Sequence, residues 1–257
     1  MKEQEKYRHS TRFMALGFLV LLLAIGNSEV SASDNELILV AGATGRTGQA
    51  TISELTRKGY RVRAFVRDID SAKEKLGIQI EFAAGDVRNR ESIDAAMHGV
   101  SAVISAIGAG RGAPENGPEF VDYGGVKNIV ESAADAGVQH FVLVSSMGAT
   151  HEDHPLNEMF NDILIWKFKG EEVLRNSGIA YTVVRPGGLT DEPGGESALL
   201  FQQGDTGEGR ISRADVARVL VDALRLPEAR GKTFEVISGV GSAPTDLRGQ
   251  FAALEED

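Results

Sequence analysis

The sequence predicts an α/β protein with a doubly wound parallel sheet and a single folded domain. Three observations predict this class: a glycine-rich turn joins an apolar strand to a helix, strand-like and helix-like segments alternate after it, and glycine or polar residues follow the strands. Such alternation is typical of a parallel sheet with helices on both faces. The 257 residues, of which 42% are hydrophobic and 25% charged, suit one domain of this kind, which we place at residues 34–257.

The first strand and the turn after it are central to this prediction. Leu37–Ala41 is an apolar run typical of a buried parallel strand. Glycines follow at Gly42, Gly45 and Gly48, and residues 49–55 then show apolar residues at helical spacing. Glycines let the backbone approach a ligand closely, and the free amides of a helix N-terminus suit a pyrophosphate. The alternative is a tight turn that binds no ligand.

The rest of the chain continues the alternation. The pattern of Arg61–Asp68 puts Val62, Ala64 and Val66 on one face of a strand. Strands are expected at Arg61–Asp68, Ile78–Phe82, Ala102–Ile107, His140–Ser146, Tyr181–Arg185 and Thr233–Ile237. Helices are expected at Ser92–His98, Phe120–Ala136, Ile163–Asn176 and Ser212–Leu226, with loops over 111–118 and 148–160.

The composition excludes several classes of function. The net charge is -10 and the predicted domain has no basic cluster, which argues against nucleic acid as a partner. The chain has no cysteine, so disulfides, thiolate metal sites and cysteine nucleophiles are excluded. The carboxylates between Glu158 and Glu172 show no metal-ligand spacing, so we expect no metal. We expect a small-molecule acceptor as the partner.

The N-terminal segment has the order of a secretory signal peptide. Basic residues from Lys2 to Arg12 precede the apolar run Phe13–Ile25, and small residues follow at 28–33. We therefore predict that residues 1–33 are a signal peptide or an N-terminal membrane anchor. The domain would then be periplasmic or membrane-anchored. If the segment is an extension that is not translocated, the domain would be cytoplasmic.

The predicted strand ends indicate where a ligand binds. In a doubly wound sheet, ligands lie beyond the carboxyl ends of the strands, at the point where the strand order reverses. One bound dinucleotide would contact all of these ends, which in this chain are 42–48, Arg67, Asp86, 106–108, 145–147 and 186–189.

The second strand end favours NADP over NAD. Arg67 stands near the end of this strand, where a guanidinium can bind the 2′-phosphate through two parallel hydrogen bonds. Arg46 in the glycine-rich turn can add a second positive charge. The alternative is that Arg67 is an exposed residue paired with Asp68 or Asp70. Asp86 at the end of the third strand can frame the adenine or act as a turn residue.

These residues together resemble the atypical short-chain dehydrogenase/reductase proteins, an NAD(P)H-binding group with NmrA-like and biliverdin-reductase-B-like members. The resemblance runs from Leu37 to about Gly239. It is carried by 42–48 (GATGRTG), 62–68 (VRAFVRD), 85–87 (GDV), 141–148 (FVLVSSMG), 181–189 (YTVVRPGGL) and 212–217 (SRADVA).

The resemblance implies a Rossmann-type fold that binds NADP. It implies cofactor contacts from Gly42, Thr44, Gly45, Arg46, Thr47, Gly48, Arg67, Asp86, Val87, Ala106, Ile107 and Gly108. It also implies that Lys167 holds the nicotinamide ribose and that Pro186, Gly187, Gly188 and Leu189 face the nicotinamide. Ordinary members carry a Tyr four residues before this Lys as the acid that protonates a carbonyl oxygen.

The chain departs from the family pattern at that acid. Its position is Ile163, and an isoleucine has no proton to give. Ser145 and Ser146 keep a hydroxyl where a substrate carbonyl could bind, so Ser145, Ser146 and Lys167 are the candidate catalytic residues. Lys167 can equally be a solvated helix lysine.

Two hypotheses of function follow. In the first, the protein is a reductase in which NADPH passes a hydride directly to a small conjugated acceptor, such as a flavin or a quinone, that takes its proton from water. In the second, it is a non-catalytic NADP(H)-binding module that senses redox state or acts as a scaffold. A sugar-nucleotide epimerase ranks lower, because that chemistry usually relies on the missing Tyr.

Overall fold

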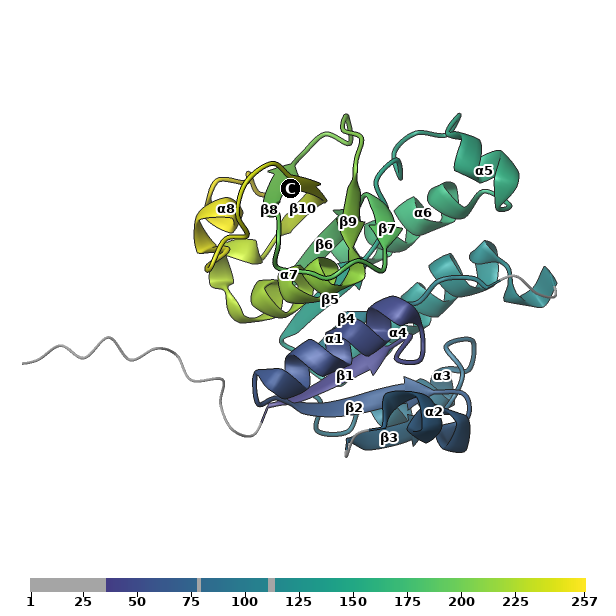
Figure 1. Cartoon of the computed structure of the whole chain (residues 1–257). Coiled ribbons are helices and arrows are strands. Elements are labelled where there is room, and N and C mark those ends of the chain that lie inside the picture. The colour runs from purple at the N-terminus through teal and green to yellow at the C-terminus, as the bar shows by residue number, and fades with distance from the viewer. Residues whose placement is uncertain (1–35, 78–79, 111–113) are drawn as a thin grey trace, which may run out of the picture. The chain divides into compact units, whose positions relative to one another are not determined.

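A mixed sheet of eight strands is the centre of the structure, a computed structural model that describes residues 36–77, 80–110 and 114–257 (Figure 1). From edge to edge the strands are β3 (Glu81–Ala84), β2 (Arg61–Val66), β1 (Leu37–Ala41), β4 (Ala102–Ser105), β5 (His140–Val144), β6 (Tyr181–Pro186), β10 (Lys232–Gly239) and β8 (Ala198–Gln202). All neighbours are parallel except β8, which is antiparallel to β10. The predicted doubly wound fold is confirmed, and the strand order reverses between β1 and β4.

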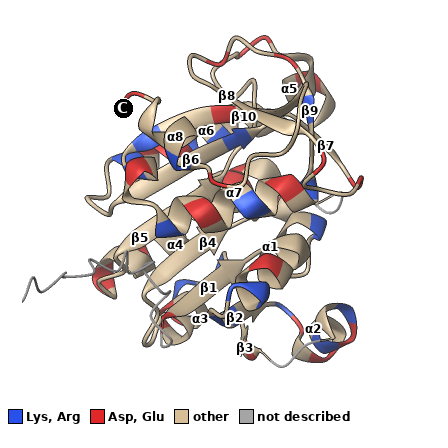
Figure 2. Ribbon diagram, turned by 60° about the vertical axis from the view of Figure 1, so that its left-hand side comes forward, with Lys and Arg blue, Asp and Glu red and all other residues tan. Residues whose placement is uncertain are grey.

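Helices cover both faces of this sheet. One face carries α1 (Arg46–Arg57) and α7 (Arg213–Arg225), and the other carries α3 (Arg90–Ala96), α4 (Val126–Asp135) and α6 (Ile163–Arg175). Shorter elements complete the described chain: α2 (Ile69–Leu76), α5 (Pro155–Met159), α8 (Arg248–Ala252), the 3₁₀ turns η1 (Pro114–Asn116) and η3 (Pro227–Ala229), and the π-helix η2 (Glu119–Gly125). Charged residues of both signs are interspersed along the helices in Figure 2.

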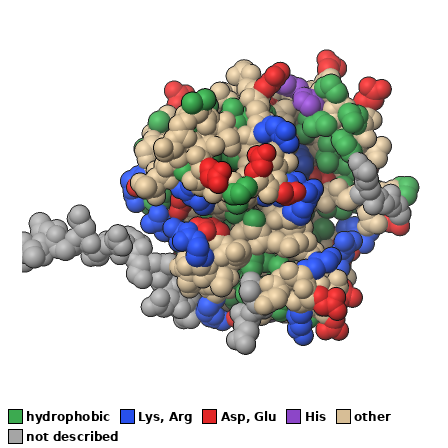
Figure 3. All heavy atoms as spheres, in the orientation of Figure 1, with side chains coloured by type: hydrophobic (Ala, Val, Ile, Leu, Met, Phe, Trp, Pro, Cys, Tyr) green, Lys and Arg blue, Asp and Glu red, His purple; other side chains and the backbone are tan. Residues whose placement is uncertain are grey.

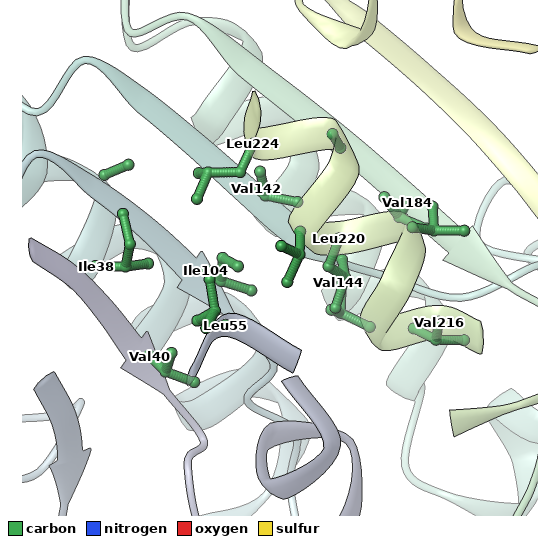
Figure 4. Packing of buried hydrophobic residues seen from close by; sticks show 14 of the residues in the cluster. Ile38, Val40, Leu55, Ile104, Val142, Val144, Val184, Val216, Leu220 and Leu224 are labelled. Carbon is green, nitrogen blue, oxygen red and sulfur yellow. The ribbon is translucent and has the colours of Figure 1, made fainter. Parts of the chain in front are cut away.

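The alternation of apolar residues in the strands builds two cores, one on each face. In β1, Ile38 and Val40 pack with Leu55 of α1 and Leu220 of α7, as Figure 4 shows, whereas Leu37 and Leu39 pack on the opposite face. This is the side-chain period of two of a strand that is buried on both sides. The predicted shared face of Val62, Ala64 and Val66 is confirmed by their place in the first core.

Short polar side chains begin several helices. Asp68 accepts a hydrogen bond from the Ser71 amide at 2.8 Å and caps α2. Ser212 accepts one from the Asp215 amide at 3.0 Å and caps α7, as its type and place predict. The first turn of α1 has no such cap, because Gly45 stands at its N-cap position. This difference leaves the amides of α1 available to a ligand.

The structure differs from the predicted elements mainly in the second half of the chain. The predicted helix Phe120–Ala136 begins as the π-helix η2 and becomes α-helical only at Val126. The predicted loop over 148–160 contains α5, which begins at Pro155. The small parallel sheet of β7 (Gly188–Thr190) and β9 (Arg210–Ser212) and the edge strand β8 were not predicted. These strands are short, and β7 and β9 pair only with each other, so their local pattern is weak.

Some predictions concern parts of the chain outside the described residues. The segment 1–33 lies there entirely, and the predicted strand Ile78–Phe82 and loop 111–118 lie there in part. The described strand in this region is β3, which begins at Glu81. Among the described residues, none of the helices is both long and apolar enough to span a membrane.

His140 makes the stability of this fold depend on pH. The residue is 2% exposed, with its Nδ1 3.3 Å from the Leu224 carbonyl oxygen and its Nε2 3.0 Å from Thr182 Oγ1. Burial lowers the pKa of His140 from 6.5 to about 4. Below pH 6.5 the unfolded chain binds a proton at His140 that the folded chain does not bind until the pH is near 4. The contribution of His140 to the free energy of unfolding is therefore fully present above pH 6.5 and is lost as the pH falls towards 4.

We expect the protonation of His140 to lower the free energy of unfolding by about 3 kcal/mol as the pH falls from 6.5 to 4. Urea unfolding measured across the range, on the wild type and on His140→Gln, isolates the contribution. The wild type should lose more stability than the variant on acidification. Parallel curves for the two proteins would contradict the account.

Candidate active site

A cavity of about 350 Å³ lies at the carboxyl ends of β1, β2, β3 and β4, where the strand order reverses. Its walls come from the glycine-rich turn and from the ends of the other three strands. The lining residues are Gly42, Ala43, Thr44, Gly45, Phe65, Val66, Arg67, Gly85, Asp86, Val87, Arg88, Ala106, Ile107, Gly108, Gly110, Asn116 and Val121. We call this space the cofactor cavity.

Close backbone contacts shape the glycine-rich side of the cofactor cavity. Gly42 has φ +78°, and a Cβ there would lie 2.4 Å from the Ala106 carbonyl oxygen at the end of β4. A Cβ on Gly48 would lie 2.2 Å from the Gly42 carbonyl oxygen. Only glycine fits at either position, since real Cβ contacts are not this short. The turn therefore brings α1 and the ends of β1 and β4 together at the point where doubly wound sheets bind their ligands.

The N-terminus of α1 lies beside the cofactor cavity. Gly45 caps the helix with no side-chain hydrogen bond, and the first turn contains no acidic residue. Thr44 and Gly45 both line the cavity. Free amides and the positive end of the helix dipole favour a phosphate at this point. These residues fit the pyrophosphate of a dinucleotide.

Two guanidinium groups and one carboxylate line the far side of the cofactor cavity. Arg67 has neither a hydrogen bond nor an ion pair within the described part of the chain. Arg88 binds Asp86 through two hydrogen bonds, Nε to Oδ1 at 2.9 Å and Nη2 to Oδ2 at 2.6 Å, and donates a third from Nη1 to the Glu115 carbonyl oxygen at 3.1 Å. The hydrogen bond from Arg88 lowers the pKa of Asp86 below its usual value.

The partners of Asp68 and Asp70 test the alternative that Arg67 is an exposed residue paired with one of these two carboxylates. The Asp68 carboxylate caps α2, and Asp70 Oδ1 lies 3.8 Å from Lys73 Nζ. Neither carboxylate pairs with Arg67 in the described structure. Arg88 was not predicted, although a basic residue two positions after a strand-end Asp86 is a signal that the sequence contains.

A second and larger cavity of about 1320 Å³ adjoins the first, because Gly110 lines both. Most of its wall is apolar or aromatic. Its lining residues are Ala109, Gly110, Pro114, Gly117, Pro118, Glu119, Phe120, Ser146, Leu156, Met159, Phe160, Asn161, Asp162, Ile163, Leu164, Trp166 and Lys167. Figure 3 shows hydrophobic side chains gathered on this side of the molecule, over α5 and α6. We call it the acceptor cavity.

The three candidate catalytic residues differ in their placement. Lys167 and Ser146 line the acceptor cavity, together with Ile163 at the start of α6. The Ser146 hydroxyl donates to the Met147 carbonyl oxygen at 3.0 Å. Ser145 lines neither cavity: it is 5% exposed, and its hydroxyl donates to the buried Glu171. The structure therefore places the two serines in different surroundings, a difference that their adjacent positions in the sequence do not predict.

The buried partners of Ser145 form a charge cluster that the sequence did not indicate. Glu171 accepts two hydrogen bonds from Arg185, at 3.0 Å from Nε and 2.6 Å from Nη2. Arg185 also donates to Glu235 at 3.1 Å. Burial raises the pKa of Glu235. Carboxylates and guanidinium compensate one another here, as buried charges require.

Several predicted cofactor residues lie outside the lining of both cavities. Arg46 pairs with Asp191, which also accepts a hydrogen bond from Arg213 at 2.6 Å. Thr47 and Gly48 belong to the first turn of α1. Pro186, Gly187, Gly188 and Leu189 lie at the end of β6 and in β7, where the Gly187 amide donates to the Val236 carbonyl oxygen at 3.0 Å.

In the described walls of the two cavities, no tyrosine takes the place of the acid that Ile163 replaces. Tyr123 lies against Trp166 with ring centroids 5.8 Å apart, and Tyr181 donates to Asp257 at 3.0 Å. Neither lines the acceptor cavity, whose described wall contains no tyrosine. His154 caps α5 through Nδ1, which accepts from the Leu156 amide at 3.2 Å, and it lies outside the wall as well.

The fold and the two adjoining cavities define a dinucleotide-binding protein of the Rossmann type. The sequence profile of the NAD(P)H-binding family matches residues 42–227, which span the glycine-rich turn, both serines and Lys167. The chain belongs to this family, and the resemblance to atypical short-chain dehydrogenase/reductase proteins is confirmed.

Known proteins similar to this chain include both enzymes and uncharacterized proteins. An uncharacterized chloroplast protein of Arabidopsis thaliana is 39% identical over 254 residues, which cover 88% of this chain and 78% of that protein. Sanguinarine reductase of Eschscholzia californica is 36% identical over 261 residues, which cover 84% and 95%. Among solved structures, a candidate NAD-dependent epimerase/dehydratase of Bacillus halodurans has a TM-score of 0.74 and 26% identity, covering 85% of this chain and all of that one (100%). Family and relatives support an NAD(P)H-dependent oxidoreductase.

The glycine-rich turn gives a prediction with a matched control. Gly42→Ala should lower the affinity for NADP(H) about tenfold or more, because the added methyl group meets the Ala106 carbonyl oxygen and displaces the cavity wall. Gly59→Ala is the control, since Gly59 has φ +84° but nothing within 4 Å of its Cβ.

Both variants carry the strain of a positive φ, which costs about 1–3 kcal/mol of stability, and Gly42→Ala should lose more because its methyl group also meets the Ala106 carbonyl oxygen. Thermal unfolding and calorimetric titration with NADP⁺ measure the two effects. Equal affinities in the two variants would show that the close approach at Gly42 does not shape the site.

Proposed function

We propose that the protein is an NADPH-dependent reductase that transfers a hydride directly to a small conjugated acceptor, such as a flavin or a quinone. The observation that carries this proposal is the pair of adjoining cavities at the carboxyl edge of the sheet, with Lys167 in the wall of the acceptor cavity and next to Gly108 of the cofactor cavity. Bound NADPH supplies the hydride. The residues of the chain bind, orient and exclude water around the reacting groups.

Groups that can bind phosphates line the cofactor cavity or lie at its edge. The uncapped first turn of α1 offers amides to the pyrophosphate. Arg67 makes no hydrogen bond or ion pair with the described residues, although the charge of Asp86 interacts with it, and it can bind a 2′-phosphate in the bidentate manner of a guanidinium. Arg88 neutralises Asp86, which would otherwise repel that phosphate. This charge balance supports NADP over NAD.

The acceptor side supports a flat, apolar substrate. Phe120, Phe160 and Trp166 line the acceptor cavity, and aromatic walls suit a conjugated ring system. Ser146 is the serine placed to orient the acceptor, whereas Ser145 is buried and hydrogen-bonded to Glu171. Lys167 would hold the nicotinamide ribose at the boundary of the two cavities, and the end of β6 with β7 would close the nicotinamide side.

The absence of a tyrosine acid restricts the chemistry. Ile163 occupies the usual position of the acid and lines the acceptor cavity, so it contributes contact area but no proton. A simple ketone needs a proton donor as the hydride arrives. A flavin or quinone accepts the hydride into a conjugated system and can take its proton from water. This difference favours the conjugated acceptor.

A second function, cofactor binding without turnover, is favoured by the same isoleucine. In that case the protein would bind NADP(H) and report its redox state to a partner. The two functions differ in one observable: only the reductase oxidises bound NADPH when an acceptor is added.

We further propose that the N-terminal residues 1–33 form a targeting segment. Their basic and apolar composition supports this, and the similar Arabidopsis protein is chloroplastic by name. The mass of the protein recovered from its native compartment would show whether the segment is removed.

Arg67 provides the test of cofactor preference. Arg67→Gln should weaken NADPH binding about tenfold or more, because a hydrogen-bonded charge pair is lost, and should leave NADH binding nearly unchanged. Arg57→Gln is the matched control, since Arg57 is an exposed residue of α1 that pairs with Glu54. Fluorescence titration with both nucleotides measures the dissociation constants. An equal loss for NADPH and NADH would contradict a 2′-phosphate contact.

Single-turnover oxidation tests the reductase itself. Protein loaded with one equivalent of NADPH is mixed with riboflavin or a naphthoquinone, and the loss of nicotinamide absorbance is followed. We expect oxidation faster than that of free NADPH under the same conditions, and slower oxidation by the Gly42→Ala variant. Tight binding of NADPH without faster oxidation by either acceptor would favour the non-catalytic module.

A further inference from the structure

A buried carboxylate lies behind the wall that separates the two cavities. Asp122 belongs to the π-helix η2, and its side chain is 0% exposed. Its Oδ1 lies 2.7 Å from Lys167 Nζ, and its Oδ2 accepts a hydrogen bond from the Ala109 amide at 2.8 Å. One carboxylate thus contacts the lysine of the acceptor cavity and the backbone segment that follows β4.

The surrounding backbone is shaped to allow this contact. A Cβ on Gly170 of α6 would lie 2.8 Å from the Asp122 carbonyl oxygen, so glycine lets α6 approach η2 closely. A Cβ on Gly108 would lie 3.6 Å from Asp122 Oδ1 and 3.9 Å from Lys167 Nζ, which places the cofactor-cavity wall directly against the ion pair. The ring contact of Tyr123 with Trp166 joins the same two elements.

Stability alone does not account for such a pair. Burying two charges costs desolvation energy that their attraction often does not exceed, and apolar residues of similar size commonly serve as well. The Lys167 side chain is 15% exposed, so its ammonium group is removed from most of the solvent while still lining the acceptor cavity. Asp122 also lies in a π-helix, an element frequent at functional sites.

We propose that Asp122 is a positioning residue for Lys167, an inference that rests on the proposed function of Lys167 at the nicotinamide ribose. An ammonium group has three donors. Asp122 attracts the ammonium group as an ion pair, with Oδ1 2.7 Å from Nζ, and holds Nζ beside Gly108 of the cofactor cavity, so that the donors of Lys167 can meet the ribose hydroxyls. Through the Ala109 amide, the same carboxylate ties this lysine to the wall formed by Gly108.

Other carboxylates near the lysine do not duplicate this role. Glu119 and Asp162 line the acceptor cavity, but both are exposed and neither pairs with Lys167 within the described structure. Glu171, four residues after Lys167 on α6, is engaged by Ser145, Arg175 and Arg185. Removal of the Asp122 charge should therefore leave Lys167 without a substitute partner.

A double-mutant cycle tests the inference. Asp122→Asn keeps an oxygen for the Ala109 amide and removes the charge, and Lys167→Met removes the ammonium group while keeping chain length. The double variant restores a neutral pair, so it should fold even if Lys167→Met alone strands a buried charge. For each folded protein, the NADPH dissociation constant and the single-turnover rate are measured, with thermal unfolding as the check of folding.

We expect Asp122→Asn to raise the NADPH dissociation constant about tenfold in the wild-type background. In the Lys167→Met background it should have almost no further effect, because the aspartate acts through the lysine. Asp222→Asn is the matched control: Asp222 is 6% exposed and lies 3.5 Å from Arg225 on α7, so its loss should lower stability without changing affinity.

Two results would overturn the inference in different ways. An equal loss of affinity from Asp122→Asn in both backgrounds would show that the aspartate merely supports the fold. If Lys167→Met, or the double variant where Lys167→Met does not fold, binds NADPH as tightly as the wild type, the proposed role of Lys167 itself is wrong. The second result concerns the proposed function, and the first leaves that function intact.

Discussion

The close approach of two strand ends is the constraint on which the rest of the structure depends. Gly42 at the end of β1 lies against the Ala106 carbonyl oxygen at the end of β4, and the strand order reverses between these strands. Any side chain at Gly42 would push the ends apart. The contact opens the cofactor cavity at the carboxyl edge and aims the uncapped N-terminus of α1 at it.

The two faces of the sheet contribute differently to the protein. The face with α1 and α7 is an apolar core, and its main contribution is stability. The face with α4 and α6 also carries the acceptor cavity, the buried Asp122–Lys167 pair and the charges around Glu171, which join α6 to β6 and β10. Residues of α6 thus meet both the substrate side and the buried charges, which makes this helix the link between packing and chemistry.

The parts of the molecule predictable from sequence were those governed by short-range patterns. The period of two in β1 and β2, the spacing of Gly42, Gly45 and Gly48, and the strand-end position of Arg67 gave the fold and the cofactor side. Long-range contacts gave no such signal. Asp122 and Lys167 are 45 positions apart in the sequence. Ser145 and Ser146 are neighbours, and only the directions of their side chains at the strand end distinguish them. The strand β8 depends on its antiparallel partner β10.

The central claim is that a phosphorylated dinucleotide binds across the carboxyl edge of the sheet. Calorimetric titration of the folded protein with NADPH and NADH tests it most directly. The account predicts saturable one-to-one binding, tighter for NADPH than for NADH. The absence of binding heat for both nucleotides at millimolar concentration, across several temperatures, would contradict it.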